Sequence, residues 1–535
     1  MVVIPANAAA LSTVTLDYGN FTGLTNTTNG IIYFLGIRYA DPPTGDLRWR
    51  APVSPPSTYL GDVNATALGF ACIGTTQKNS GATTDEDCLF GNVYIPINTT
   101  EASKLPVLVF FHGGGFETGR TRDAPSENIV LSSVEPLIFV TFEYRLGQFG
   151  FLAGTPVQQD GQLNAGLFDQ RAGLEWVQRY ISKFGGDPRF LFCFCAISSA
   201  EDKFNSRVTI WGQSAGAASV SYHLIAEGGE NKNLFIRAIG DSPPALYLPH
   251  YTDTYIEDLF AQFTGLAGCG GSGNGSAIMA CLRAAPTGTI ATAGRDTLAN
   301  LTSNLYPIGP IADGVFIRER PVEAFLNGRF VHVPVMFGSN TDEGAKWSAS
   351  LDNPAANTSS PNATEMTVYN FIAGQYATFN EPSFQTAIRL FYPLADYNQS
   401  FSLQGQQIYG EMRYICTALM IAGAAHHAGL PAYQYHWDNP VLGSNHADEL
   451  DAFFDGDEIF DPDDQILVTA MRQYWTSFAT SGVPVAEGAP SWVPNGANGS
   501  PRILLHPGEI AMEQVSENLT KRCAFWHALT SELAT

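Results

Sequence analysis

The chain has 535 residues, of which 45% are apolar and 34 are phenylalanine, enough to build one large hydrophobic core. Its 51 acidic residues outnumber 28 Lys and Arg residues, and the resulting formal net charge of −23 argues against nucleic acid or an anionic membrane as a partner. No apolar run approaches the roughly 18 residues of a membrane span. No linker or repeat divides the sequence, so we expect one enlarged domain over residues 1–535.

In chain order, the first predicted elements form a small antiparallel sheet between Thr13 and Ile37. A central, mostly parallel sheet follows, and its first strand runs into HGGGF at residues 112–116. Because three consecutive glycines lack Cβ atoms, the backbone there can approach a substrate and direct free N–H groups at a carbonyl oxygen. A helix is predicted over residues 163–186. The predicted strands of the central sheet are Val107–Phe111, Leu137–Phe142, Val208–Trp211, Ile236–Ile239, Val333–Phe337, Ala432–Trp437 and Arg502–His506.

The most informative motif is GQSAG at residues 212–216, between a predicted strand and a predicted helix over residues 215–226. The two glycines remove side chains that would collide in a sharp turn, and Ser214 stands free at the tip. The N-terminus of the helix directs N–H groups toward developing negative charge. Alone the motif is a weak signal, because roughly 0.3 GxSxG matches arise by chance in a chain of this size.

Two polar loops follow later predicted strands. The loop at residues 338–344 contains Glu343, and the loop at residues 443–450 contains His446. The chain order is therefore serine, acid, histidine, each just past a strand, as a catalytic triad on an open α/β sheet requires. Between the two loops, a helical segment from about Thr367 to Ala428 is expected to line or roof the substrate pocket.

These motifs, with others along nearly the whole chain, resemble the type-B carboxylesterase/lipase family, which includes cholinesterases and many fungal esterases and lipases. The resemblance implies an α/β-hydrolase fold: a central mostly parallel sheet flanked by helices, with a small N-terminal antiparallel sheet. Two positions depart from the family pattern, since Gly91 replaces a usual Leu and Glu143 a usual Asn. The further motifs are FLGIRYA at 34–40, EDCL at 86–89, YRLG at 144–147, NAGLFDQ at 164–170 and CAFW at 523–526.

The resemblance implies a role for each residue of a serine hydrolase site that cleaves small carboxylic esters. Ser214 would attack the ester carbonyl while His446 takes its proton, and Glu343 would hold the imidazole. The reaction passes through an acyl-enzyme and needs no metal or organic cofactor. His112 is interpreted as a structural partner of the glycine loop, and Ser242 as support for the acid. The backbone N–H groups implied for the oxyanion hole are those of Gly114, Gly115 and Ala215.

Other acids in the same loops are rivals for the triad position. Asp342 is the most serious rival to Glu343, because the two are adjacent. Asp448 and Glu449 lie close to His446 in sequence, although neighbouring groups in one loop seldom reach the ring correctly.

The eight cysteines allow 105 full pairing schemes, and the family resemblance implies three individual disulfide bonds. Cys193 and Cys195 are left over, inside a Phe-rich segment at residues 189–205 that the family lacks between the helix and the elbow strand. We hypothesise that this segment is a retained intron or gene-model error, which the transcript sequence would test; a tolerated surface loop is the alternative. The implied disulfides are Cys72–Cys88, Cys269–Cys281 and Cys416–Cys523.

The loop between Cys72 and Cys88 bears on substrate class. It contains no aromatic residue or Leu. It therefore lacks an apolar flap that could bind a lipid interface, and it lacks an aromatic ring that could contact a quaternary ammonium group. A general esterase for soluble, short-to-medium esters is favoured over an interfacially activated triacylglycerol lipase and over a cholinesterase. An inactive binding or adhesion module, from another functional class, is disfavoured because all three triad residues are present; a peptidase stays open.

Localisation rests on indirect signals. The chain carries more Asn-X-Ser/Thr sequons than the four or five expected by chance, which favours a secreted glycoprotein. Residues 1–10 are too short for a signal peptide, so we expect that the true N-terminus is missing from the gene model; an intracellular protein is the alternative. The sequons begin at Asn20, Asn26, Asn64, Asn98, Asn274, Asn300, Asn357, Asn362, Asn398, Asn498 and Asn518.

Overall fold

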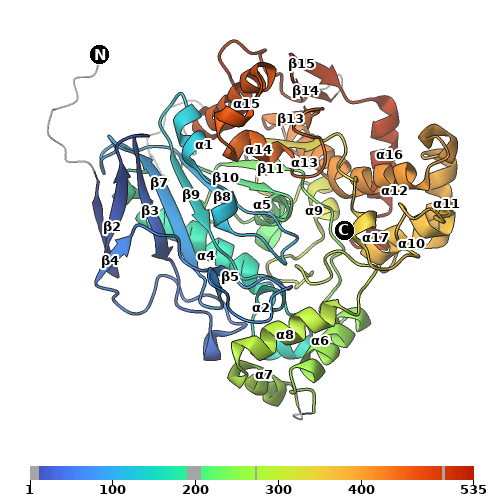
Figure 1. The fold of residues 1–535 in the computed structure, drawn as a ribbon, viewed down its shortest axis with the longest axis horizontal. Coiled ribbons are helices and arrows are strands. Elements are labelled where there is room, and N and C mark those ends of the chain that lie inside the picture. The colour runs from blue at the N-terminus through green and yellow to red at the C-terminus, as the bar shows by residue number, and fades with distance from the viewer. Residues whose placement is uncertain (1–10, 189–206, 272–273, 497–499) are drawn as a thin grey trace.

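The computed structural model describes the chain except for residues 1–10, 189–206, 272–273 and 497–499. The suspected insertion at 189–205, with Cys193 and Cys195, therefore lies outside the described residues. Within the described part, a thirteen-stranded sheet runs through the molecule with helices on both faces (Figure 1). Its strands are β1 Thr13–Leu16, β2 Gly19–Asn26, β3 Ile31–Arg38, β4 Asp62–Ala65, β7 Phe90–Pro96, β8 Val107–Phe111, β9 Ile138–Phe142, β10 Val208–Gln213, β11 Arg237–Asp241, β12 Val335–Asn340, β13 Ala432–Trp437, β14 Pro501–His506 and β15 Glu509–Gln514.

The central part of the sheet is parallel, as predicted. Strands β9, β8, β10, β11, β12, β13 and β14 pair in that order, each parallel to the next. The α/β-hydrolase fold class is thus confirmed, with an antiparallel N-terminal part. This part is continuous with the central sheet, because β3 pairs with β7 and β7 pairs with β9. Strand β7 was not among the predicted strands.

Alternation along the strands divides the core into two layers. On β8, Val107, Val109 and Phe111 face one hydrophobic cluster, whereas Leu108 and Phe110 face the other. Successive strand residues point to opposite faces, so a strand that is buried on both sides reads as one continuous apolar run. Helices α4, α5, α9 and α13 contribute to the first cluster, and α1, α14 and α15 to the second.

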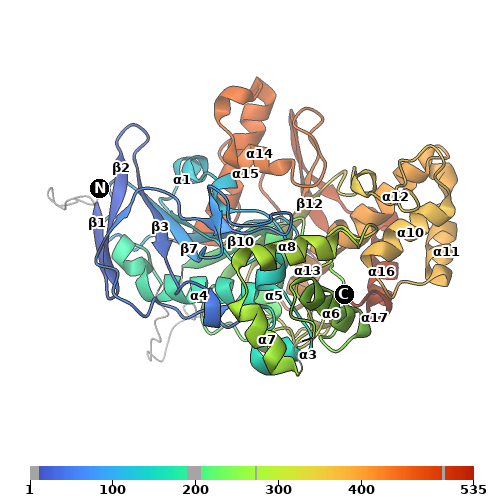
Figure 2. The same ribbon diagram turned by 60° about the horizontal axis from the view of Figure 1, so that its bottom comes forward.

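Two groups of helices extend beyond this sandwich, as Figure 2 shows. Helices α6 to α8 form one, and α10 to α12 with α16 form the other, each around its own apolar cluster. The α-helices are α1 Glu127–Ser132, α2 Gly147–Gly150, α3 Thr155–Asp160, α4 Ala165–Tyr180, α5 Ala215–Ile225, α6 Thr254–Leu266, α7 Gly275–Ala284, α8 Thr287–Leu298, α9 Pro321–Leu326, α10 Glu365–Gln375, α11 Glu381–Leu390, α12 Phe401–Gly410, α13 Cys416–His427, α14 Glu449–Phe454, α15 Pro462–Ser481, α16 Glu517–Ala528 and α17 Thr530–Leu533.

Three disulfides tie the peripheral segments together. The bond between Cys416 and Cys523 joins the start of α13 to α16, near the C-terminus. The other two close short loops, and all three have the partners that the resemblance implied: Cys72–Cys88, Cys269–Cys281 and Cys416–Cys523.

We propose that the chain forms one domain, because strands from both ends of the sequence join one sheet. No helix in the described part is both long enough and apolar enough to cross a bilayer.

Candidate active site

Ser214 lies in the sharp turn between β10 and α5. Its φ of 55° and ψ of −122° are a strained conformation for a residue with a side chain. The turn needs glycine on both sides, because a Cβ at Gly212 would collide with the Gly216 backbone, and a Cβ at Gly216 with the carbonyl oxygen of Phe111. The Ser214 N–H donates to the carbonyl of Asp241 on β11 at 2.9 Å, which ties the turn to the sheet.

The structure brings the predicted serine, histidine and acid into one hydrogen-bonded chain. His446 Nε2 lies 2.8 Å from Ser214 Oγ, and its Nδ1 lies 2.6 Å from Glu343 Oε2. A carboxylate can only accept, so Nδ1 carries the ring proton and Nε2 is free to accept the serine proton. The Glu343 side chain is fully buried and that of His446 is 8% exposed. This geometry suits a serine nucleophile with its general base and orienting acid.

Two further groups hold the carboxylate of Glu343. Its Oε1 atom accepts hydrogen bonds from the Ser242 hydroxyl and from the Asn340 N–H, the latter at 2.8 Å. Ser242 therefore supports the carboxylate of Glu343, as the sequence analysis suggested. Since Oε1 is engaged by these donors, Oε2 is the atom that faces the imidazole.

The rival acids have other surroundings. Burial, and then the nearby Asp438 and Asp448, raise the pKa of Asp342. Asp448 accepts hydrogen bonds from the backbone and side-chain amides of Asn445. Glu449 is fully buried and accepts from the side chain of Asn340. Among the described interactions, none of these three carboxyl groups contacts the His446 ring.

Two aromatic residues that the sequence analysis did not single out surround His446. The Tyr414 ring lies 4.2 Å from the imidazole and the Trp347 ring 5.4 Å, measured between centroids. Trp347 Nε1 also donates to the backbone oxygen of Glu343 at 2.8 Å. Trp347 follows Glu343 by four residues, and this short spacing is the sequence signal that could have identified it as a neighbour of the site. Tyr414 lies within the segment expected to line or roof the pocket.

The glycine loop lies against the serine. A Cβ at Gly113 would come within 3.1 Å of the Ser214 Cβ. Gly114 and Gly115 have φ values of 107° and 65°, a region that favours glycine. The Tyr306 ring fills the space that a side chain on Gly115 would need. The glycine loop thus lies beside Ser214 without intervening side chains of its own, and the role of Gly114, Gly115 and Ala215 as an oxyanion hole stays a prediction.

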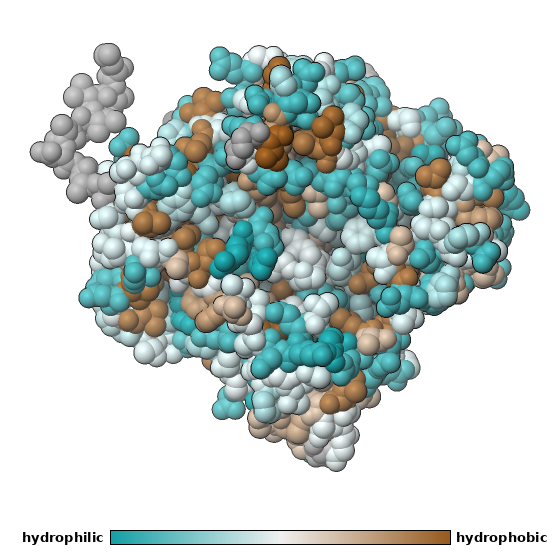
Figure 3. Space-filling view, viewed as in Figure 1, coloured by the Kyte–Doolittle hydropathy of each residue, from teal (hydrophilic) through white to brown (hydrophobic). Residues whose placement is uncertain are grey.

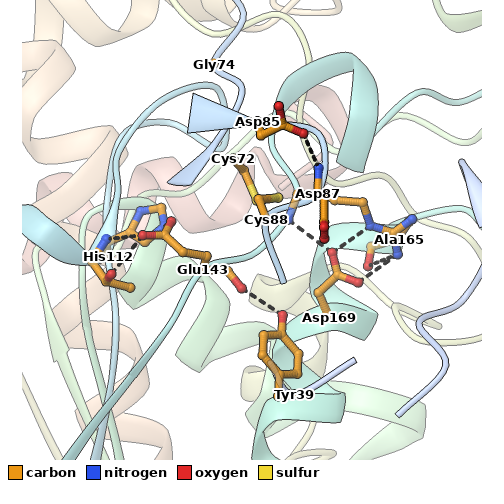
Figure 4. Close-up of a disulfide and its surroundings, with 12 residues drawn as sticks. Tyr39, Cys72, Gly74, Asp85, Asp87, Cys88, His112, Glu143, Ala165 and Asp169 are labelled. Atoms are coloured by element: carbon orange, nitrogen blue, oxygen red, sulfur yellow. Dashed lines mark hydrogen bonds and ion pairs between the residues drawn. A yellow bond between two sulfur atoms is a disulfide. The ribbon is translucent and has the colours of Figure 1, made fainter. Parts of the chain in front are cut away.

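His112 holds the backbone of the glycine loop. Its Nδ1 donates to the Gly113 carbonyl at 2.9 Å, and its ring stacks on Tyr144 with centroids 4.3 Å apart. Its Nε2 faces Glu143 Oε2 at 3.7 Å, an arrangement visible in Figure 4. Burial lowers the pKa of His112 to about 4 and raises that of Glu143 to about 7. His112 thus has the surroundings of a structural partner of the loop.

The disulfide loop is fixed to the glycine loop by Glu117. Thr75, in the loop closed by Cys72 and Cys88, donates its N–H to the Glu117 backbone oxygen at 2.9 Å. Its hydroxyl donates to Glu117 Oε2 at 3.1 Å, while Oε1 accepts from the Ile308 N–H at 2.9 Å. Burial raises the pKa of Glu117 to about 8. The two hydrogen bonds from Thr75 therefore hold the polar loop against Glu117, directly after the glycine loop.

Among the described residues, no three His, Cys, Asp or Glu side chains are grouped as a metal site would need.

Comparison with known proteins places these features in context. The carboxylesterase family matches residues 10–526. Pyrethroid hydrolase Ces2e of Rattus norvegicus is 30% identical over 500 residues, covering 89% of this chain and 82% of that protein. Lipase 1 of Geotrichum candidum is 34% identical over 352 residues, or 58% of this chain, and the match spans only 59% of the lipase. Crystalline Aspergillus niger EstA has a TM-score of 0.82 and 30% identity, covering 98% of this chain and 99% of its own. These similarities support carboxylic ester hydrolysis by a serine hydrolase.

Glu117→Gln should change how the stability depends on pH. The folded-state pKa of Glu117 is raised, so its stabilising contribution is complete below about pH 4.5 and is lost as the pH rises toward about 8. Between pH 5 and 8 the free energy of unfolding of the wild type should fall relative to the variant, by up to about 1.4 kcal/mol per pH unit. Urea denaturation at pH 5, 6.5 and 8 measures this difference, with the exposed Glu135→Gln as control. Parallel curves for wild type and Glu117→Gln would contradict the expectation.

Proposed function

This chain belongs to the carboxylesterase family, and we propose that it hydrolyses carboxylic esters through an acyl-enzyme formed on Ser214. The observation that supports this most directly is the continuous hydrogen-bonded chain from Ser214 through His446 to Glu343. Ser214 attacks the ester carbonyl as His446 Nε2 takes its proton, and Glu343 stabilises the resulting imidazolium.

The proposed oxyanion hole consists of the N–H groups of Gly114, Gly115 and Ala215. Each such donor typically contributes about 3–4 kcal/mol to the stabilisation of the transition state. The protonated His446 then gives its proton to the departing alcohol. Water, activated by the same imidazole, releases the acid and regenerates Ser214.

Ser214→Ala tests this proposal. The variant should lose ester turnover by on the order of 10⁵–10⁶-fold, because no other group can form the acyl-enzyme. Labelling by a fluorophosphonate probe should also disappear, while the thermal unfolding midpoint stays close to that of the wild type. Wild-type-like turnover in purified Ser214→Ala would overturn the assignment. A wild-type protein that neither reacts with the probe nor cleaves esters would favour the alternative of an inactive binding module.

The same assay distinguishes the two adjacent acids. Glu343→Gln leaves Ser214 and His446 in place but removes the charge that holds the imidazole, so activity should fall by roughly 10⁴-fold. Asp342→Asn is the matched control and should stay within a few-fold of the wild type, because Asp342 does not contact the ring. A larger loss in Asp342→Asn than in Glu343→Gln would reverse the roles.

We propose dissolved, short-to-medium esters as the substrate class, with interfacially activated lipase action as the alternative. The polar loop between Cys72 and Cys88 is held by Thr75 and Glu117, which argues against a mobile oily flap. On the face drawn in Figure 3, hydrophobic residues lie in small groups among hydrophilic ones. The rate should rise smoothly with ester concentration through the solubility limit. A sharp increase where an emulsion forms would favour the lipase.

We also propose that the protein is secreted and glycosylated. Three disulfides are typical of an oxidising compartment. All ten described sequon asparagines are exposed or half-exposed, so a glycan could reach each one. Protein recovered from its native culture medium should lose apparent mass on treatment with an N-glycosidase. An unchanged mass, or recovery only from the cell interior, would contradict this proposal.

A further inference from the structure

Arg413 lies in an unusual helical turn between α12 and α13. Residues Glu411–Ile415 form a π-helical turn between α12 and α13. Such turns are rare and occur frequently at functional sites, because the extra residue changes the direction of the neighbouring side chains. In this turn Tyr414 packs against the ring of His446, and Arg413 lines a cavity.

The Arg413 guanidinium is buried without a counter-ion. The residue is 4% exposed, and within the described part of the chain no carboxylate lies within 4.0 Å of its nitrogens. It packs against the rings of Tyr409 and Tyr414, with its central carbon 5.5 and 5.9 Å from their centroids. Its Nε has no hydrogen-bond partner among the residues that the structure describes.

Two other buried arginines pair with a carboxylate, whereas Arg171 resembles Arg413 in having no carboxylate partner among the described ion pairs. Arg48 is paired with Glu86, and Arg145 with Asp169, each through two side-chain hydrogen bonds. Burying a charge is costly unless an opposite charge or hydrogen bonds compensate for it. The rings of Tyr409 and Tyr414 compensate the charge of Arg413 only in part. The buried positive charge of Arg413 therefore lacks an anion that would balance it.

The cavity that Arg413 lines begins at the glycine loop. Gly115, which the proposed mechanism places at the ester carbonyl oxygen, lies in its wall, as do Tyr306 and Gln375. A group bound in this cavity would thus belong to the part of the substrate next to the scissile carbonyl.

Glu117 does not supply the missing charge. Tyr306 lies within electrostatic reach of both Arg413 and Glu117. Burial raises the pKa of Glu117 to about 8, so near pH 7 most of this carboxyl is protonated and neutral. The cavity therefore keeps the positive charge of Arg413.

We propose that Arg413 is a specificity-determining residue that selects esters whose acyl part carries a carboxylate, such as monoesters of short dicarboxylic acids. This inference rests on the proposed ester hydrolysis at Ser214. The free carboxylate of the substrate pairs with the guanidinium, while Ser214 attacks the ester carbonyl at the other end. Water then completes the hydrolysis to a dicarboxylic acid and an alcohol.

The test compares two substrates of nearly equal shape, ethyl hydrogen glutarate and the corresponding ethyl ester monoamide, near pH 7. The wild type should have a kcat/KM at least about tenfold higher for the charged ester, as a hydrogen-bonded charge pair predicts. In Arg413→Met the ratio of the two kcat/KM values should approach one, and in Arg413→Lys part of the preference should remain. A wild type that cleaves both esters equally, or an unchanged ratio in Arg413→Met, would overturn the inference.

A measurement on the wild type alone covers the case in which the variants fail to fold. Glutarate should inhibit the hydrolysis of a neutral short ester competitively and at least about tenfold more strongly than glutaramide. Equal inhibition by both compounds would count against the role of Arg413 while leaving ester hydrolysis intact. A wild type that cleaves no ester at all would instead refute the proposed function.

Discussion

Parallel pairing of β10, β11, β12 and β13 is the constraint on which the rest of the structure depends. The register sets Gly212 opposite Gly240 and Gly240 opposite Phe337, so neighbouring strands end at the same edge of the sheet. The serine, the acid and the histidine each follow one of these strands by a few residues. Because a slip by one residue would move every side chain of a strand into the opposite layer of the core, the packing of the two layers also fixes the relative positions of the three groups.

The buried acids near this edge differ in what surrounds them. Glu343 has two donors on one oxygen and the imidazole on the other. Glu143 accepts hydrogen bonds from the Thr121 N–H and hydroxyl on one oxygen, whereas its other oxygen has no hydrogen-bond partner within the described part of the chain. Burial is similar for both, so the number and placement of donors distinguish the acid suited to holding the histidine from one that supports the loop.

The central strands, the serine turn and the loops of the acid and the histidine could be predicted from sequence, because each combines an apolar run with a specific polar or glycine signal. The continuity of the N-terminal strands with the central sheet could not, since β7, which joins the two parts, was not identified. The π-helical turn at Glu411–Ile415 also escaped prediction, because its residues read as ordinary helix. The positions of Tyr414 and Arg413 follow from that turn, and they depend on distances in space that spacing along the chain does not encode.

The hydrogen-bonded partners of the site are widely separated along the polypeptide. Ser214 and His446 are 232 residues apart, and Glu343 and His446 are 103 apart. A nascent chain therefore cannot assemble the proposed triad until β13 and the loop beyond it have left the ribosome. With Ser214 as the proposed nucleophile, its covalent labelling would report that the chain has folded through His446, and fragments that end before His446 would not react.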